Sequence, residues 1–164
     1  MITKQQILDD CRRETEIIKH LATKLPEGAL DWRPTPGQRT TLELMRYMTA
    51  APEIAAIYCI TGNWDHGQKI GEASEQVTAD SFADAMDRQL SRVQEVLGDL
   101  DEAAATTKPA EMPWKEPTTQ SVCVLQTLVK SYVAYRMQFF LYAKQAGNAE
   151  LSSLDCWAGV SSLD

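Results

Sequence analysis

The sequence predicts an all-α protein, a four-helix bundle with crossover loops. Four segments carry apolar residues at helical spacing, and no segment keeps the period-two alternation of a half-buried strand. The longest segment, Ser121–Gly147, contains no proline and no glycine before its last residue. Roughly 16 to 20 residues separate successive segments, a length typical of crossover connections rather than of tight helical hairpins. We therefore expect a bundle over residues 1–147 and a tail, residues 148–164, docked on it.

Charge and composition argue against several classes of partner. The 164 residues are 44% hydrophobic and 24% charged, with a net charge of −7, which is typical of one soluble domain. The 16 basic residues are scattered, so no basic patch indicates nucleic acid or an anionic membrane as a partner. No apolar run approaches the ~20 residues of a membrane span, and the first residues lack the apolar core of a signal peptide. We expect a cytoplasmic protein.

Cysteines and histidines give little support for a disulfide or a metal site. Because there is no C-x-x-C pair and no secretion signal, we expect the cysteines to be reduced structural thiols. Only His20 and His66 are present, which is too few for a histidine-rich metal site. The four cysteines are far apart in the sequence: Cys11, Cys59, Cys123 and Cys156.

The first helix is predicted over residues 3–24. Thr3 and Gln6 have the spacing of a capping box at its start, and a proline and a glycine follow its end. His20 lies off the apolar side of this helix, where we expect a partly exposed side chain. The expected buried seam comprises Leu8, Cys11, Thr15, Ile18, Ala22 and Leu25.

The second helix is predicted over residues 41–62. It follows a loop with two prolines and a glycine within four residues, and Trp32 in that loop should pack over one end of the bundle. Thr40 and Glu43 give a second capping box, and Pro52 predicts a kink in the helix. The expected buried stripe comprises Leu44, Tyr47, Met48, Ala51, Ile54, Ala55 and Tyr58.

The third helix is predicted to begin near Thr78 or Asp80. Before it, residues 63–78 form a polar connection in which we expect His66 to be solvated. The alanine-rich stretch DEAAATT is expected to extend the helix toward Pro109. The expected inward face comprises Phe82, Met86, Leu90, Val93, Leu97 and Leu100.

The fourth helix is predicted over residues 121–147, after a proline-stiffened loop at residues 109–117. Gly147 ends it, and Leu154 and Trp157 are expected to dock the tail. The expected buried face of the helix comprises Val122, Leu125, Val129, Tyr132, Phe139, Ala143 and Ala146.

Three short motifs carry a family resemblance. They are W-R-P…P-G at residues 32–37, L-E-L-M-R-Y at residues 42–47 and Y-R-M-Q at residues 135–138, in this order. With them, residues 3–147 resemble the DinB-like (YfiT-like) four-helix-bundle superfamily. The resemblance implies a bundle that is often a homodimer. In many members three histidines bind a divalent metal such as zinc or nickel, and several members act as transferases or isomerases that use low-molecular-weight thiols.

This chain departs from the family pattern at all three ligand positions. Tyr47, Ser131 and Tyr135 stand where the family has histidine, and their hydroxyl groups form a poor zinc site. We therefore expect no metal and no cofactor. Three interpretations stay open: the tyrosines only pack and hydrogen-bond, they line a metal-free pocket for a small molecule, or their phenolates bind a ferric ion.

Arg136 lies beside the third of these positions and completes the candidate ligand site Tyr47, Ser131, Tyr135 and Arg136. An arginine there can bind a carboxylate bidentately, which favours an acidic ligand. The alternative is an intramolecular partner, either Glu43 or Glu53 of the second helix. No pair of a nucleophile and a base is apparent, so we nominate no catalytic residue.

We expect a small-molecule binding or interaction protein, with an acidic compound or a thiol as its ligand. The alternatives are a thiol-dependent transferase that uses the same cleft and a structural dimer module. A homodimer is expected on the family resemblance, through apolar residues off the main seams: Ile7, Ile17, Val124 and Phe140.

Overall fold

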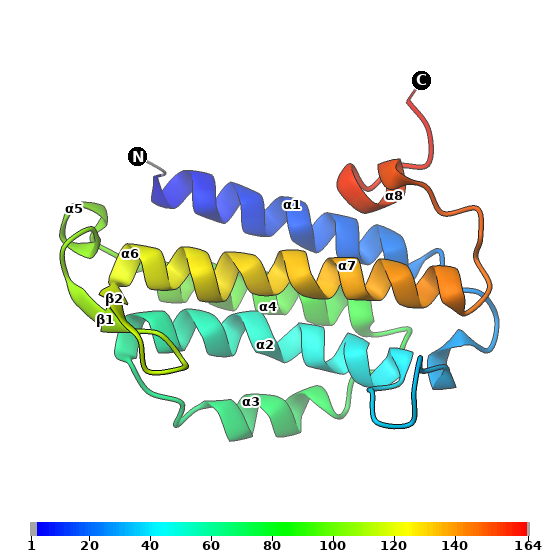
Figure 1. Ribbon diagram of the computed structural model, residues 1–164, viewed down its shortest axis with the longest axis horizontal. Coiled ribbons are helices and arrows are strands. Elements are labelled where there is room, and N and C mark those ends of the chain that lie inside the picture. Colours follow the sequence, from blue (N-terminus) through cyan, green and yellow to red (C-terminus); the bar gives the residue numbers. More distant parts are fainter. Residues whose placement is uncertain (1–2, 164) are drawn as a thin grey trace.

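The structure is a computed structural model that describes residues 3–163. Four long helical units run side by side (Figure 1). They are α1 (Lys4–Ala22), α2 (Thr41–Thr61), α4 (Phe82–Gly98) and a last unit of three consecutive pieces, α6 (Gln120–Cys123), η2 (Val124–Val129) and α7 (Lys130–Gln145). The all-α four-helix architecture predicted from apolar periodicity is confirmed.

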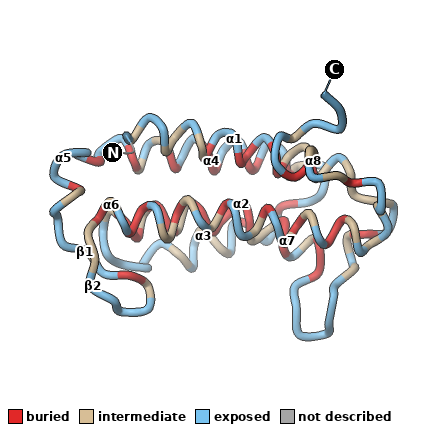
Figure 2. The backbone as a smooth tube through the Cα atoms, turned by 45° about the horizontal axis from the view of Figure 1, so that its top comes forward, coloured by how far each residue is buried: buried red, intermediate tan, exposed pale blue. Residues whose placement is uncertain are grey.

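The core lies between these helices and is centred on α2. This helix packs against α4, η2 and α7 as well as a short outer helix, while α1 packs on α4 and α7. Buried positions follow the inward sides of the helices, and the connections at both ends of the bundle are mostly exposed (Figure 2). The predicted inward face of the third helix is buried throughout: Phe82, Met86, Leu90, Val93, Leu97 and Leu100.

Both predicted capping boxes are present. At α1 the backbone amide of Gln6 donates to Thr3 Oγ1 at 3.2 Å, and the amide of Thr3 donates to the Gln6 side chain at 2.9 Å. At α2 the same reciprocal pair joins Thr40 and Glu43, at 2.6 and 3.1 Å. Each box satisfies two amides that the first helical turn leaves without partners.

The connections hold more structure than the sequence predicts. The polar segment after α2 contains α3 (Gly67–Ser74), which packs on α2. The alanine-rich stretch does not extend α4: it forms a separate helix, α5 (Glu102–Ala105), because the Asp101 side chain accepts from two amides and starts a new helix. Residues 29–31 form a 3₁₀ turn, η1 (Ala29–Asp31).

A short hairpin replaces part of the predicted loop at residues 109–117. Strands β1 (Pro109–Glu111) and β2 (Pro117–Thr119) pair antiparallel, with Pro109 opposite Thr119. Each strand has three residues, too few to show an alternating pattern in the sequence. The hairpin lies at the end of the bundle where α2 ends and α6 begins (Figure 1).

The buried face predicted for the start of the fourth helical unit is wrong. Val122 and Leu125 are exposed, and Gln120, Cys123, Val124 and Leu128 are buried instead. The reason is η2, a π-helical segment, in which each turn contains more than 3.6 residues. Counting back from Tyr132 at α-helical spacing therefore selects the wrong side, whereas Tyr132, Phe139 and Ala143 within α7 are buried as predicted.

The tail packs on the bundle through a short helix, α8 (Ser153–Trp157), which contacts α1 and α7. Its contact side differs from the expected one, since Leu151, Asp155 and Cys156 are buried while Trp157 is 67% exposed. Gly159 has a φ of 67°, and a Cβ there would lie 3.3 Å from the Ile17 backbone. This glycine therefore permits both the turn and the close approach to α1.

Candidate functional site

Two of the three residues that the family resemblance places at ligand positions meet between α2 and α7. The hydroxyl of Tyr135 donates to that of Tyr47 at 3.4 Å, and the two rings pack edge to face with centroids 4.9 Å apart. Burial raises the pKa of the Tyr135 phenol, and the neighbouring Tyr47 hydroxyl raises it further. Tyr135 therefore stays protonated at neutral pH and can donate a hydrogen bond.

Ser131 lies one turn before Tyr135 on α7. Its hydroxyl donates to the Leu128 carbonyl at 2.7 Å, which is a common arrangement for a serine inside a helix. The structure thus brings the two tyrosines into contact and leaves the serine hydroxyl engaged with its own helix.

Arg136 faces another part of the bundle. Its Nε lies 2.8 Å from Glu14 Oε2 of α1, an ion pair whose two side chains are buried. Its Nη1 donates to the Cys156 carbonyl of α8, and its guanidinium lies 5.1 Å from the ring centroid of Trp157. The partner of Arg136 is an intramolecular carboxylate, as one interpretation expected, but it is Glu14 rather than Glu43 or Glu53, because helix α1 and the tail cover the side of α7 on which Arg136 lies.

The tyrosine pair does not fit the divalent metal of the family pattern. Zinc and nickel sites use imidazole, thiolate or carboxylate ligands, whereas this pair offers two phenols, one with a raised pKa. The Arg39 guanidinium lies 3.9 Å from the Tyr47 ring centroid, so a cation already occupies one face of the pair. Between residues 3 and 163, no group of three or more His, Cys, Asp or Glu side chains is placed to hold a metal ion.

A cleft of about 640 Å³ opens beside the tyrosine pair, with Tyr47 in its lining. One wall is the W-R-P…P-G loop, the floor is the first half of α2, and the other wall is α3. Gly67 and Gly71, one turn apart on α3, line the cleft. A Cβ at Gly71 would meet nothing within 4 Å, whereas one at Gly67 would lie 3.6 Å from the Ile54 side chain. Apolar side chains of Pro36, Ala50 and Ile54 line it together with polar groups.

Three arginines line this cleft. Arg33 is 4.0 Å from Glu43, and Arg46 is 3.6 Å from Glu75 while also donating to the Val77 carbonyl. Arg39 has no carboxylate within 4 Å among the described residues and rests on the Tyr47 ring. An exposed guanidinium without an ion-pair partner can bind an incoming carboxylate with two parallel hydrogen bonds.

Sequence reasoning missed the three arginines and the α3 wall. The W-R-P…P-G motif contains Arg33, and Arg39 follows it directly, so their charge was visible in the sequence. What the sequence did not show is that α3 folds back over α2 and turns the arginine-bearing loop into one wall of a cleft.

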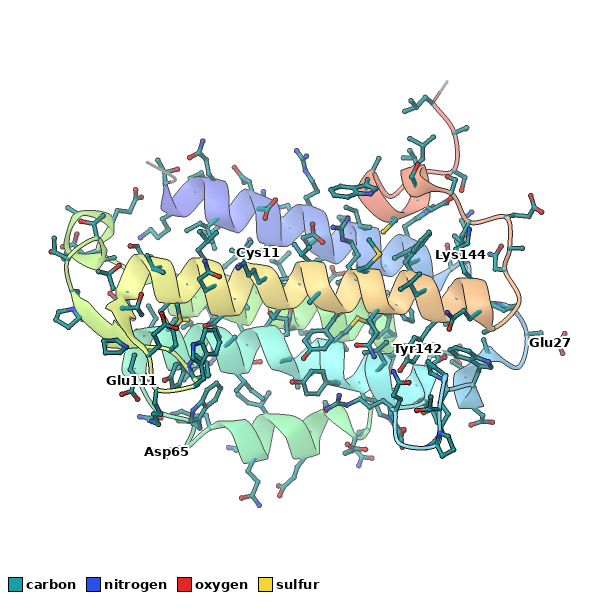
Figure 3. The ribbon with its side chains drawn as sticks, in the orientation of Figure 1. Cys11, Glu27, Asp65, Glu111, Tyr142 and Lys144 are labelled. Carbon is teal, nitrogen blue, oxygen red and sulfur yellow. The ribbon has the colours of Figure 1, made fainter. Side chains whose placement is uncertain are left out.

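The end of the bundle that carries the W-R-P…P-G loop is also the end near the cleft. The loop Trp32 packs edge to face on Tyr142 of α7 at 5.2 Å, as predicted for a tryptophan over a bundle end. Figure 3 places Tyr142 and Lys144 toward this end and Glu111 toward the hairpin end. The arginine cleft therefore belongs to the part of α2 that lies nearer to Trp32.

Comparison with solved structures supports the fold. No family model matches the chain, and no curated protein matches it. Among solved structures, the chain is similar to a DinB-like protein, YjoA of Bacillus subtilis, with a TM-score of 0.63 and 15% sequence identity. The match covers 87% of this chain and 92% of that chain. Together with the helix order described above, it shows that the chain has the DinB-like fold.

Proposed function

We propose that this protein is a metal-free, small-molecule binding protein that takes a small organic acid in the cleft beside Tyr47. The observation that carries the proposal is the arrangement of Arg33, Arg39 and Arg46 around one cleft, in a chain whose net charge is −7. A locally positive cleft in an acidic protein favours an anionic ligand.

The electrostatics support a carboxylate as the recognised group. Glu43 and Glu75 neutralise part of the charge of Arg33 and Arg46, which leaves Arg39 as the free positive group. Its guanidinium is held against the Tyr47 ring, so little side-chain freedom is lost when it binds a ligand. The apolar lining at Ile54 suits a ligand with a hydrocarbon or aromatic body.

A thermal-shift screen with small carboxylic acids tests this function, followed by calorimetric titration with the acid that gives the largest shift. Arg39→Gln should weaken binding at least tenfold, since a charged hydrogen-bond pair contributes about 1.5–3 kcal/mol. Gly71→Leu should abolish binding without loss of stability, because a Cβ at Gly71 meets nothing within 4 Å and Gly71 lines the cleft. Arg12→Gln, on the exposed side of α1, is the matched control and should bind normally.

A thiol-dependent transferase in the same cleft is the alternative. The same screen therefore includes glutathione and cysteine, and elemental analysis of the purified protein measures bound metal. One metal ion per chain together with a thiol-induced shift would favour the transferase. A carboxylate-induced shift without metal would favour the binding protein.

We also propose a homodimer, formed through the outer side of the fourth helical unit. Two of the residues first expected at this interface are wrong, because Ile17 and Val124 are buried in the core. A different apolar stripe faces outward along α6, η2 and α7. Its members are Val122, Leu125, Val133, Met137 and Leu141, each at least 36% exposed.

This stripe has the composition of an interface core. Between Gln120 and Ala143 the sequence contains two charged residues, Lys130 and Arg136, and Arg136 is buried. Exposed helix faces of monomers normally carry charge, whereas interface cores are depleted of it.

Light scattering at tens of micromolar should give twice the monomer mass, and Met137→Glu should give the monomer. Ser91→Glu, an exposed position on α4, is the control, and a monomeric wild-type protein would end this proposal and with it the alternative of a structural dimer module.

A cytoplasmic location is part of the same proposal. All four cysteines are free and buried thiols, which suits a reducing compartment. Among residues 3–163, no helix combines the length and the apolar character that a bilayer crossing requires.

A further inference from the structure

The far end of α2 carries a pair of cysteines that the sequence separates by 64 residues. Cys59 lies in the last turn of α2 and Cys123 is the last residue of α6. Their sulfur atoms are 3.5 Å apart, and both side chains are buried. Cys11 and Cys156 are also free, buried thiols.

We propose that Cys59 and Cys123 form a redox-active dithiol that peroxide oxidises to an intramolecular disulfide. A disulfide bond is about 2.05 Å long, so the sulfur atoms must approach each other by roughly 1.5 Å from their distance of 3.5 Å. Side-chain rotation and small helix shifts cover such a distance. The site is separate from the arginine cleft, since Tyr47 and Cys59 are about 18 Å apart along α2 at 1.5 Å per residue.

The surroundings of the pair distinguish the two sulfurs. The two sulfur atoms share a hydrogen bond, and this interaction lowers the pKa of Cys123 below its ordinary value. The same interaction, together with burial, raises the pKa of Cys59. Cys123 also lies 3.9 Å from the Thr127 hydroxyl. Because the thiolate is the reactive form of cysteine, Cys123 is the attacking sulfur and Cys59 the resolving one.

The reaction balances with hydrogen peroxide as the oxidant. The Cys123 thiolate attacks one peroxide oxygen, the O–O bond breaks, and hydroxide leaves, which gives a sulfenic acid. The Cys59 sulfur then attacks the Cys123 sulfur, the S–O bond breaks, and water leaves with the Cys59 proton. Overall two thiols lose two electrons and two protons, and one peroxide becomes two waters.

The β1–β2 hairpin covers the pair and limits which oxidants reach it. The Glu111 carbonyl of β1 accepts a hydrogen bond from Tyr58 at 3.0 Å and lies 3.8 Å from the Cys123 sulfur. Figure 3 shows Glu111 at this end of the bundle. A small neutral oxidant reaches such a site through local opening of the hairpin, whereas a bulky aromatic disulfide reagent is excluded.

The disulfide would tie the end of α2 to the start of the fourth helical unit. Gln120 already joins these elements, since its side-chain amide donates to the Cys59 carbonyl at 3.1 Å. A crosslink across 64 residues restricts the unfolded chain strongly. We expect the oxidised protein to melt on the order of 5 °C or more above the reduced protein.

Peroxide treatment of the full-length protein, followed by mass spectrometry, tests the proposal. The expected result is the loss of two hydrogen masses and a single crosslinked peptide that joins residues 59 and 123, reversed by dithiothreitol. Cys156→Ser is the control and should form the same crosslink. Failure of the wild-type protein to lose two hydrogens, or a crosslink that involves Cys11 or Cys156, would overturn the proposal.

Two variants test the roles of the sulfurs. In Cys59→Ser, a sulfenic acid on Cys123 has no resolving thiol, so dimedone should label residue 123 after peroxide treatment. In Cys123→Ser, labelling of Cys59 should be at least tenfold slower. Faster labelling of Cys59 than of Cys123 would overturn the assignment of the attacking sulfur. The crosslink measured in the wild-type protein keeps the proposal testable even if either variant folds poorly.

Discussion

Tyr135 and Arg136 are consecutive residues of α7, yet their side chains belong to different parts of the molecule. Tyr135 touches Tyr47 of α2 beside the open arginine cleft. Arg136 pairs with Glu14 of α1 and holds the Cys156 carbonyl of the tail. Successive residues of an α-helix point about 100° apart, which is enough to separate a half-open polar surface from a closed ion pair.

The difference shows how the same residue type serves two purposes. Arg136 is buried and its charge is balanced inside the protein by Glu14, so a ligand that recruited it would leave Glu14 without its partner. Arg39 is exposed and has no carboxylate within 4 Å in the described part of the chain. Arg39 in the cleft is therefore available for a ligand, whereas Arg136 on the α1 side of α7 stabilises the fold.

The largest expected effect is the loss of stability when the buried ion pair between Arg136 and Glu14 is broken. Arg136→Met leaves the Glu14 carboxylate buried without a counter-charge, and we expect a loss of about 3–5 kcal/mol in the free energy of unfolding at pH 7. Replacing both partners, as in Glu14→Met with Arg136→Met, should restore most of it, since a packed apolar pair can substitute for a buried ion pair. Urea denaturation monitored by circular dichroism measures both.

The loss of unfolding free energy in Arg136→Met should also become larger as the pH rises. Burial raises the pKa of Glu14 above its ordinary value of 4.5, and Arg136 opposes this shift. In Arg136→Met the opposing charge is gone, so the pKa of Glu14 in the folded state rises further and the carboxyl must be protonated to stay buried. The loss of stability is therefore small near pH 4 and grows as the pH rises above 4.5. A penalty that is equal at pH 4 and pH 7 would contradict a buried charge as its cause.

The next largest expected effect is the stabilisation by zinc of a variant that carries histidines at positions 47, 131 and 135. The triple variant Tyr47→His, Ser131→His and Tyr135→His replaces the hydroxyl groups at the three family positions with imidazoles. If the three positions converge, zinc at about 100 times its dissociation constant should stabilise the folded variant by about 2.7 kcal/mol. The wild-type protein should show no such gain, because its hydroxyl groups are weak zinc ligands.

The contribution of position 131 to zinc binding needs a separate measurement. Its hydroxyl is engaged with the Leu128 carbonyl, so the double variant Tyr47→His, Tyr135→His separates the contribution of the observed tyrosine pair from that of the third position. A folded triple variant that gains no more from zinc than the double variant would show that position 131 lies outside the site.

The sequence predicted those features that depend on neighbouring residues. The capping boxes at Thr3 and Thr40, and the spacing of Met86, Val93 and Leu97, are local patterns, and all are present. The partner of Arg136 was not predictable in this way, because the position on α7 does not say which helix covers that side. The contact of Cys59 with Cys123 likewise depends on how α2 and α6 meet in space.

The π-helical segment explains a different kind of failure. Residues 124–129 are ordinary apolar and polar residues without glycine or proline, so no residue type marks the change in helical spacing. Its effect is visible only in which side chains are buried: Val124 and Leu128 are inside, and Leu125 is outside. The arginine cleft was missed for a related reason, since α3 forms by packing on α2 rather than through a strong apolar stripe of its own.

The stabilising contribution of Asp155, in the tail helix α8, should be lost at acidic pH. Burial alone would raise the pKa of Asp155, but hydrogen bonds from the Ser152 amide, from His20 at 2.8 Å and from two serine hydroxyls lower it overall. Because the pKa of Asp155 is lower in the folded state, its contribution to stability is present above its ordinary value of 3.8 and is lost as the pH falls below it. Asp155→Asn should cost about 1–2 kcal/mol at pH 7.

The measurement is the difference in unfolding free energy between wild type and Asp155→Asn, followed from pH 7 to pH 3. The difference should be constant above about pH 5 and shrink below the ordinary carboxyl pKa. His20→Ala should reproduce part of the loss at pH 7, since it removes one of the partners. A difference that stays constant down to pH 3 would mean that Asp155 supports the tail through packing rather than through its charge.

The smallest expected effect completes the comparison of the two arginines. Arg39→Gln removes a guanidinium that lies over the Tyr47 ring at 3.9 Å, and exposed cation–π contacts contribute about 0.5–1 kcal/mol. We expect the variant to lose no more than that in urea denaturation, at least threefold less than Arg136→Met, and to fold with an unchanged circular dichroism spectrum. Because Arg39 has no ion-pair partner within residues 3–163, any carboxylate that stabilises the wild-type protein should stabilise this variant markedly less. A loss of several kcal/mol in Arg39→Gln without ligand would mean that Arg39, like Arg136, stabilises the fold, and the distinction between a ligand-binding arginine and a structural one would fail.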